Sequence, residues 1–190
     1  MDIFLQLWGG IFYLLAKIFL AISENKNRKN FRIHGWIVYI IGVPAWVIIL
    51  FLNKNWIVMS IEAGSIPSMI FGIIMLSNKS YIHDLEKYIK TFTGILIVLG
   101  IMYSIYDFGG INNFSQILEL GITVGFLMGT YLLAKKNHNG WLYFALMNIS
   151  MGILMIIQSK WIFVILQIIS IFFVIYGFMT AKKEINFQNR

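Results

Sequence analysis

The chain has 190 residues, of which 59% are hydrophobic and only 12% charged, with 15 basic residues against 8 acidic ones. A soluble domain needs about a quarter of its residues charged, so this composition excludes an ordinary water-soluble globule and predicts lipid around most of the surface. The chain contains no cysteine and its three histidines are scattered, which excludes disulfides and thiolate metal sites and leads us to expect no metal and no other cofactor.

Seven apolar segments follow one another along the chain, most of them near the length of about 20 residues that crosses a hydrocarbon core. They cover residues 3–22, 33–52, 56–76, 91–106, 115–134, 141–157 and 161–180, and the fourth is the shortest. The first has neither a charged region before it nor a small-residue cleavage site after it, so we interpret it as a retained helix. Because backbone groups cannot stay unpaired in lipid, the fold class is predicted to be an all-α integral membrane protein with seven transmembrane helices.

The basic residues divide unequally between the two sides of these spans. Only Lys54 and Lys160 lie on one side, and Lys17 lies near the inner end of the first span. Twelve lie on the other side: Lys26, Arg28, Lys29, Arg32, Lys79, Lys87, Lys90, Lys135, Lys136, Lys182, Lys183 and Arg190. The positive-inside rule then predicts an outside N-terminus and a cytoplasmic C-terminus in a bacterial inner membrane. It also explains the net charge of +7 without a nucleic-acid partner.

The chain contains an internal repeat with an offset of 105 residues. Nine positions are identical between 35–72 and 140–177, among them Gly35-Trp36 with Gly140-Trp141, Trp56 with Trp161, Ser65 with Ser170 and Gly72 with Gly177. The offset relates spans 1–3 to spans 5–7, which predicts parallel three-helix repeats joined by a linker helix, an arrangement found among transporters. We expect a first bundle over 1–80, a linker region over 81–112 and a second bundle over 113–190.

The second copy also carries a recognisable motif. The basic pair Lys135-Lys136 precedes Trp141-Leu142, followed by Asn148, Gln158 and the late Tyr176-Gly177. With the 3+1+3 plan, this resembles the PnuC-type nicotinamide riboside transporters, which are related in fold to the SWEET sugar transporters. The first copy departs from the family pattern, with Val43 where an asparagine is expected and with Glu62, Ser65 and Ser68 in the third span.

The resemblance implies facilitated diffusion of nicotinamide riboside, a cytoplasmic kinase that traps the solute by phosphorylation, and a homotrimer. Thiamine and riboflavin are carried by relatives and stay open as cargo. A substrate-binding subunit of a larger transporter and an accessory or structural membrane protein are the alternatives. The spans offer no arrangement typical of an embedded hydrolase, so we do not expect an enzyme.

Eight residues are candidates for the substrate site. Trp141 and Asn148 lie seven residues apart and share a helix face, so the indole can stack on a ring while the amide binds a polar group. Glu62 and Gln167 are repeat mates, and a polar residue within a span is a functional hypothesis by default. The others are Trp46, Tyr176, Gln158 and Glu119. For each residue the alternative is structural: an interfacial aromatic residue, or a polar contact between helices.

Overall fold

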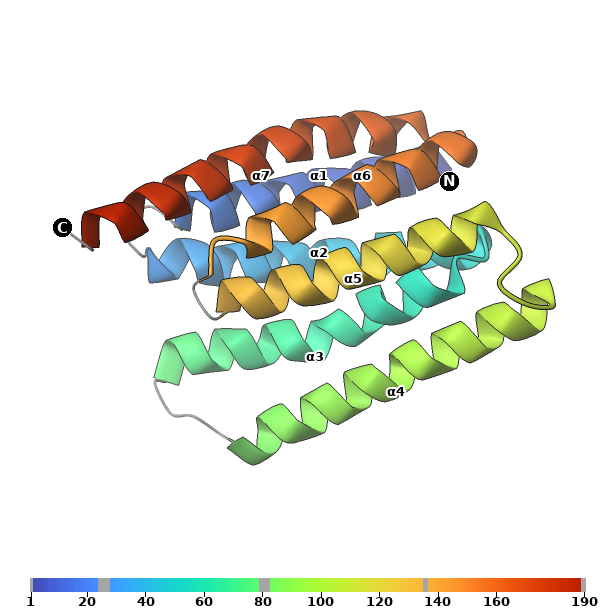
Figure 1. The fold of residues 1–190 in the computed structure, drawn as a ribbon, viewed down its shortest axis with the longest axis horizontal. Coiled ribbons are helices and arrows are strands. Elements are labelled where there is room, and N and C mark those ends of the chain that lie inside the picture. The colour runs from blue at the N-terminus through green and yellow to red at the C-terminus, as the bar shows by residue number, and fades with distance from the viewer. Residues whose placement is uncertain (1, 24–27, 79–82, 135–136, 189–190) are drawn as a thin grey trace.

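The computed structural model describes residues 2–23, 28–78, 83–134 and 137–188, and Figure 1 shows a bundle of helices that run along one long axis. In that part of the chain there are seven helices, α1 to α7, and no strand. They are α1 (Asp2–Ser23), α2 (Lys29–Leu52), α3 (Trp56–Asn78), α4 (His83–Phe108), α5 (Phe114–Ala134), α6 (Gly140–Ile157) and α7 (Trp161–Gln188). The seven-helix prediction is confirmed. Five of the basic residues that support the predicted orientation lie outside the described residues: Lys26, Lys79, Lys135, Lys136 and Arg190.

Within the described residues, six helices (α1 to α4, α6 and α7) are long and apolar enough by length and composition to cross a membrane. In α5 the apolar segment Phe114–Thr130 lies within a helix that continues to Ala134. The fourth helix is longer than the sequence predicts, because its first turns are polar and hydropathy alone places the start of the span too late. Within those turns Lys90 forms an ion pair with Glu86, one helical turn away.

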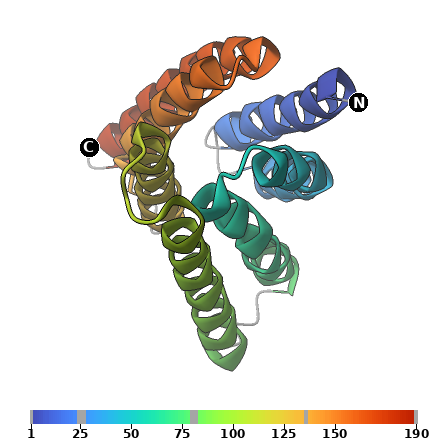
Figure 2. The same cartoon turned by 90° about the vertical axis from the view of Figure 1, so that its right-hand side faces the viewer.

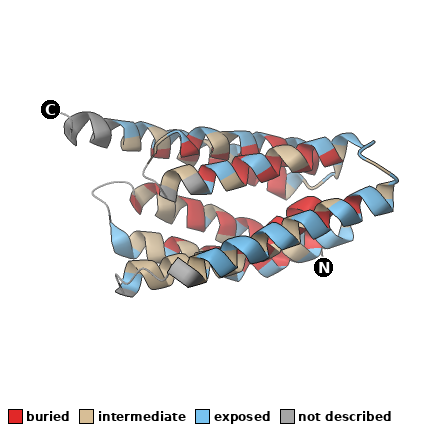
Figure 3. Ribbon diagram, turned by 60° about the horizontal axis from the view of Figure 1, so that its bottom comes forward, coloured by how far each residue is buried: buried red, intermediate tan, exposed pale blue. Residues whose placement is uncertain are grey.

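The outer surface of the bundle is apolar. Large hydrophobic side chains such as Leu99, Met102 and Phe172 are more than half exposed, while the polar residues Asn148, Gln167 and Glu62 are buried. Figure 3 shows the buried positions on the faces that the helices turn toward one another, and exposed positions along most of α4. This inverted distribution is what a lipid environment requires, and it supports the membrane assignment.

The repeat seen in the sequence has a counterpart in the turns that follow α2 and α6. Lys54 and Ser159, which are repeat mates, adopt left-handed backbone conformations with φ of 58° and 57°. The next residue donates its N–H to a carbonyl five positions back in both turns, Asn55 to Leu50 and Lys160 to Met155, each at 2.9 Å. The two helix ends therefore close with the same backbone motif.

A packing contact repeats in the same way. Gly72 of α3 lies so close to the Trp36 ring of α2 that an added Cβ would be 1.9 Å from it. Gly177 of α7 lies against the Trp141 ring of α6, where an added Cβ would be 2.6 Å away. Each glycine thus admits the large ring of its partner helix, and the shared offset indicates that both copies use one packing solution.

The contacts between helices follow the repeat as well. The pairs α1–α2 and α5–α6 pack together, as do α2–α3 and α6–α7, and the two sets meet where α1 contacts α7 and where α3 contacts α5. Exchanging helices 1, 2 and 3 for 5, 6 and 7 leaves this pattern unchanged. Figures 1 and 2 show α4 beside α3 at the edge of the bundle, where Thr93 donates a hydrogen bond to the Gly64 carbonyl at 3.1 Å.

Candidate functional site

A group of buried polar side chains lies inside the bundle and is centred on Asn148 of α6. The Oδ1 of Asn148 accepts hydrogen bonds from the Tyr13 hydroxyl at 3.1 Å, from Lys17 Nζ at 2.5 Å and from the Ser170 hydroxyl at 3.4 Å. These donors come from α1 and α7, and all four side chains are buried. One amide oxygen therefore connects three helices, α1, α6 and α7, and α1 lies more than a hundred residues before the other two in the chain.

Helix α1 contributes Tyr13 and Lys17 from a single face, because residues four positions apart lie one above the other on a helix. The small buried side chains of Ala16 and Ala21 allow that face to pack closely. Lys17 is only 5% exposed, which is rare for a lysine within an apolar span. Its ammonium lies 4.5 Å from the centre of the Tyr13 ring and 5.6 Å from that of Phe144, both within the range of cation–π attraction.

Glu62 of α3 occupies a second position in the same polar group. The Tyr39 hydroxyl of α2 lies 3.2 Å and 3.1 Å from its two carboxylate oxygens and donates to the carboxylate. The ring of Tyr39 lies 5.6 Å from that of Tyr13, which connects this pair to the Asn148 group. The bundle thus encloses both a basic side chain, Lys17, and an acidic one, Glu62, and each forms a hydrogen bond with a buried polar side chain.

Aromatic rings surround these polar atoms. Trp46 stacks on Phe163 with ring centres 4.0 Å apart and planes at 11°, and its indole N–H donates to the Gly9 carbonyl at 3.1 Å. The same indole lies 5.5 Å from the Tyr13 ring. Trp141 meets Phe144 edge to face at 5.9 Å, so the rings extend from α2 and α1 across to α6 and α7.

Several buried polar atoms lack a hydrogen-bond partner among the described residues. They are Nε1 of Trp141, Nδ2 of Asn148, and both Nε2 and Oε1 of Gln167. Gln167 lies one turn from Ser170 on α7 and faces Gly152 of α6. Unpaired polar groups are costly inside a protein, so these four atoms on α6 and α7 make this region the candidate site for a polar molecule.

Of the eight predicted site residues, five belong to this region: Trp46, Glu62, Trp141, Asn148 and Gln167. The structure does not bring the other three to it. Gln158 exchanges two hydrogen bonds with Asn55 at the turn after α6, at 2.9 Å and 3.1 Å. Glu119 accepts from the backbone N–H groups of Ile57 and Val58 at 2.9 Å and 3.2 Å, and so caps the start of α3.

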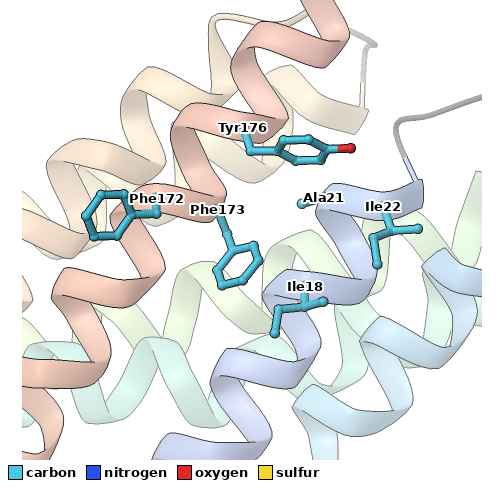
Figure 4. A pocket seen from close by; sticks show the side chains of 6 residues that line it. All are labelled: Ile18, Ala21, Ile22, Phe172, Phe173 and Tyr176. Carbon is cyan, nitrogen blue, oxygen red and sulfur yellow. The ribbon is translucent and has the colours of Figure 1, made fainter.

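Tyr176 is 46% exposed and lies at a different place, between α1 and α7. There it lines an apolar pocket of about 360 Å³ (Figure 4). The remaining lining residues are Ile18, Ala21, Ile22, Phe172 and Phe173. Substrate binding by Tyr176, Gln158 and Glu119 stays a prediction without support from their contacts.

Sequence reasoning missed Lys17, Tyr13 and Tyr39. The charge count assigned Lys17 to the inner end of its span, whereas its ammonium lies inside the bundle on Asn148. The available signal was a single lysine within a long apolar segment, since an ionisable residue inside a span usually faces a functional interior. The spacing of Tyr13 and Lys17 places both on one helix face and would have strengthened that reading.

An apolar bundle of seven helices with related halves and an enclosed polar site is typical of a multi-pass membrane transporter. The family model described as "Nicotinamide mononucleotide transporter" matches residues 4–183, and the chain belongs to this family. The resemblance to PnuC-type transporters is thereby confirmed, and the family is one of membrane transporters of nicotinamide-related compounds. No curated protein and no solved structure matches the chain.

Proposed function

We propose that the chain carries a nicotinamide nucleoside, with nicotinamide riboside as the first candidate, across a bacterial inner membrane. The proposed mechanism is facilitated diffusion by alternating access. The observation that carries the proposal is the set of buried polar atoms on Trp141, Asn148 and Gln167 that find no hydrogen-bond partner in the described part of the chain. A carboxamide or a ribose hydroxyl can both donate and accept hydrogen bonds, so such a solute would satisfy the free groups on both amide side chains.

The arrangement of rings and polar groups supports a particular pose. The pyridine ring would lie among Trp141, Phe144 and Tyr13, with its substituent at Asn148. The ribose hydroxyls would reach Gln167 and the carboxylate of Glu62, which is an acceptor of hydroxyl groups. A hydrogen-bonding site discriminates strongly against molecules that leave its polar groups unpaired, which gives selectivity among vitamin precursors such as thiamine and riboflavin.

Transport would use the two related halves. The bonds of Asn148 with Tyr13 and Lys17 connect α6 of one half to α1 of the other. A rocking motion that exchanges these bonds for bonds to the solute would expose the site to one side and then to the other. In this proposal the N-terminus lies outside, the C-terminus lies in the cytoplasm, a kinase traps the solute, and the chain assembles as a trimer.

Transport by purified protein in liposomes tests the proposal. Labelled nicotinamide riboside should equilibrate across the membrane at the same rate with and without a proton or sodium gradient, and internal unlabelled riboside should accelerate its entry by exchange. Empty liposomes provide the background. An absolute need for an ion gradient would contradict facilitated diffusion, and entry no faster than into empty liposomes would contradict the proposed cargo.

A further inference from the structure

The ring cage that would hold a pyridinium already holds a cation that belongs to the protein. The ammonium of Lys17 lies over the Tyr13 ring at 4.5 Å and near the Phe144 ring at 5.6 Å. It also donates to Oδ1 of Asn148, the group at which the ring substituent would bind. A permanently cationic pyridinium nucleoside must therefore enter beside this ammonium or displace it.

Bulk water screens the repulsion between these two cations less than at the surface, because Lys17 is 5% exposed and Phe144 is 8% exposed. Glu62 supplies the opposite charge and interacts electrostatically with Lys17, but it is hydrogen-bonded to Tyr39, and within the described residues its carboxylate makes no hydrogen bond to Asn148. In the pose proposed above, the basic group of Lys17 would therefore lie beside the ring substituent, and the acidic group of Glu62 would lie beside the ribose.

From this arrangement we propose that the transporter prefers a nucleoside whose pyridine ring carries a carboxylate over the amide-bearing nucleoside, and that Lys17 determines this preference. The inference rests on the proposed function and specifies which charged groups its substrate carries. A ring carboxylate would accept the hydrogen bond of Lys17 in place of Asn148 Oδ1, and it would make the nucleoside zwitterionic. Its negative charge would offset the repulsion between the pyridinium and the ammonium.

The position of Glu62 predicts which anionic group of the substrate is favoured. A phosphate on the ribose of a mononucleotide would lie at the Glu62 end and meet a charge of its own sign. The preferred anionic group is therefore the ring carboxylate, and the mononucleotide should bind more weakly than the acid nucleoside.

The test is the ratio of dissociation constants for the acid and amide nucleosides, measured by calorimetry on the purified full chain. The native protein should bind the acid nucleoside at least about tenfold more tightly, and Lys17→Met should abolish or reverse this ratio. Lys17→Arg should preserve it, since the guanidinium keeps the charge. Lys90→Met, which removes a lysine from the exposed side of α4, controls for net charge. A ratio is the chosen readout because partial misfolding lowers the binding of both nucleosides together.

The possible failures separate the two proposals. If neither nucleoside binds to folded native protein, the proposed function is wrong. If both bind but the ratio is the same in the native protein and in Lys17→Met, the inference about Lys17 is wrong while the proposed function survives. Tighter binding of the mononucleotide than of the acid nucleoside would overturn the placement of the anionic group on the ring.

Discussion

Lys17 and Asn148 lie 131 positions apart in the chain, and the ammonium of Lys17 donates a hydrogen bond to Oδ1 of Asn148 inside the bundle. The first belongs to α1 and the second to α6, so the bond joins the two halves of the repeat. Asn148 also has an amide nitrogen without a partner among the described residues. A single side chain therefore connects the halves and still has a donor available to a solute, which is why we place it at the centre of the site.

Gln167 and Gln158 offer a matched pair of substitutions. Both amide atoms of Gln167 lack a partner in the described part of the chain, whereas Gln158 is bonded twice to Asn55. Gln167→Ala should weaken nicotinamide riboside binding about tenfold, the effect of about 1.4 kcal/mol from one lost hydrogen bond to the ligand. Gln158→Ala should lower the melting temperature and leave the dissociation constant nearly unchanged. Calorimetry and thermal unfolding in detergent measure the two effects, and the reverse pattern would refute this assignment.

The two repeated Trp–Gly contacts predict equivalent losses of stability. An added Cβ at Gly72 or Gly177 would overlap the Trp36 or Trp141 ring, so Gly72→Ala and Gly177→Ala should each destabilise the fold by about 1–3 kcal/mol. Gly94→Ala is the control, because nothing lies within 4 Å of its added Cβ and alanine favours helix. Thermal unfolding should rank Gly94→Ala at or above the native protein. Equal stability of all three variants would show that the rings do not pack as described.

Glu119 is expected to contribute to stability rather than to solute binding. Its carboxylate caps the first turn of α3 through Ile57 and Val58, so Glu119→Ala should cost about 1–2 kcal/mol of unfolding free energy. Glu119→Gln keeps an acceptor oxygen and should cost less. Transport per folded molecule should be unchanged in both variants. If a variant instead lost affinity for the riboside while its thermal stability stayed normal, Glu119 would have to be assigned to the substrate site.

The absence of native cysteine allows a direct test of alternating access. Ser170 is fully buried beside Asn148, so Ser170→Cys should react slowly with a thiol reagent and faster when the site opens to the reagent's side. Bound nicotinamide riboside should protect it. Asn139→Cys, at an exposed position in the turn before α6, should react at one rate regardless of solute. Equal labelling of position 170 with and without saturating riboside would argue against a site next to Asn148.

Much of the fold could be predicted from the sequence because lipid imposes simple rules. Long apolar segments gave seven helices, and the identical residues Trp36 and Trp141 indicated a repeat that the structure shows again at Gly72 and Gly177. The start of α4 was placed too late because polar residues occupy its first turns.

The site was predictable only in part. Asn148 and Gln167 are polar residues within apolar segments, and they stand out in the sequence. The contacts of Lys17 depend on how α1 packs against α6 and α7, and spacing along one helix does not reveal that packing. Glu119 stood out as a polar residue within a span, and Gln158 as part of the family motif, but their partners are backbone amides and Asn55 at the helix ends. The polarity of a residue within a span therefore identified candidate site residues. Only the tertiary contacts distinguished the polar groups that are free to bind a ligand from those that bond other parts of the protein.

The most direct test of the central claim is calorimetric titration of nicotinamide riboside into purified native protein and into Asn148→Ala. Thiamine, riboflavin and a sugar serve as comparison solutes. We predict saturable binding of the riboside by the native protein and a loss of at least about tenfold in affinity for Asn148→Ala, since this change removes both a ligand donor and the acceptor that orders Tyr13 and Lys17. Equal riboside affinity in the two proteins would contradict a substrate site centred on Asn148.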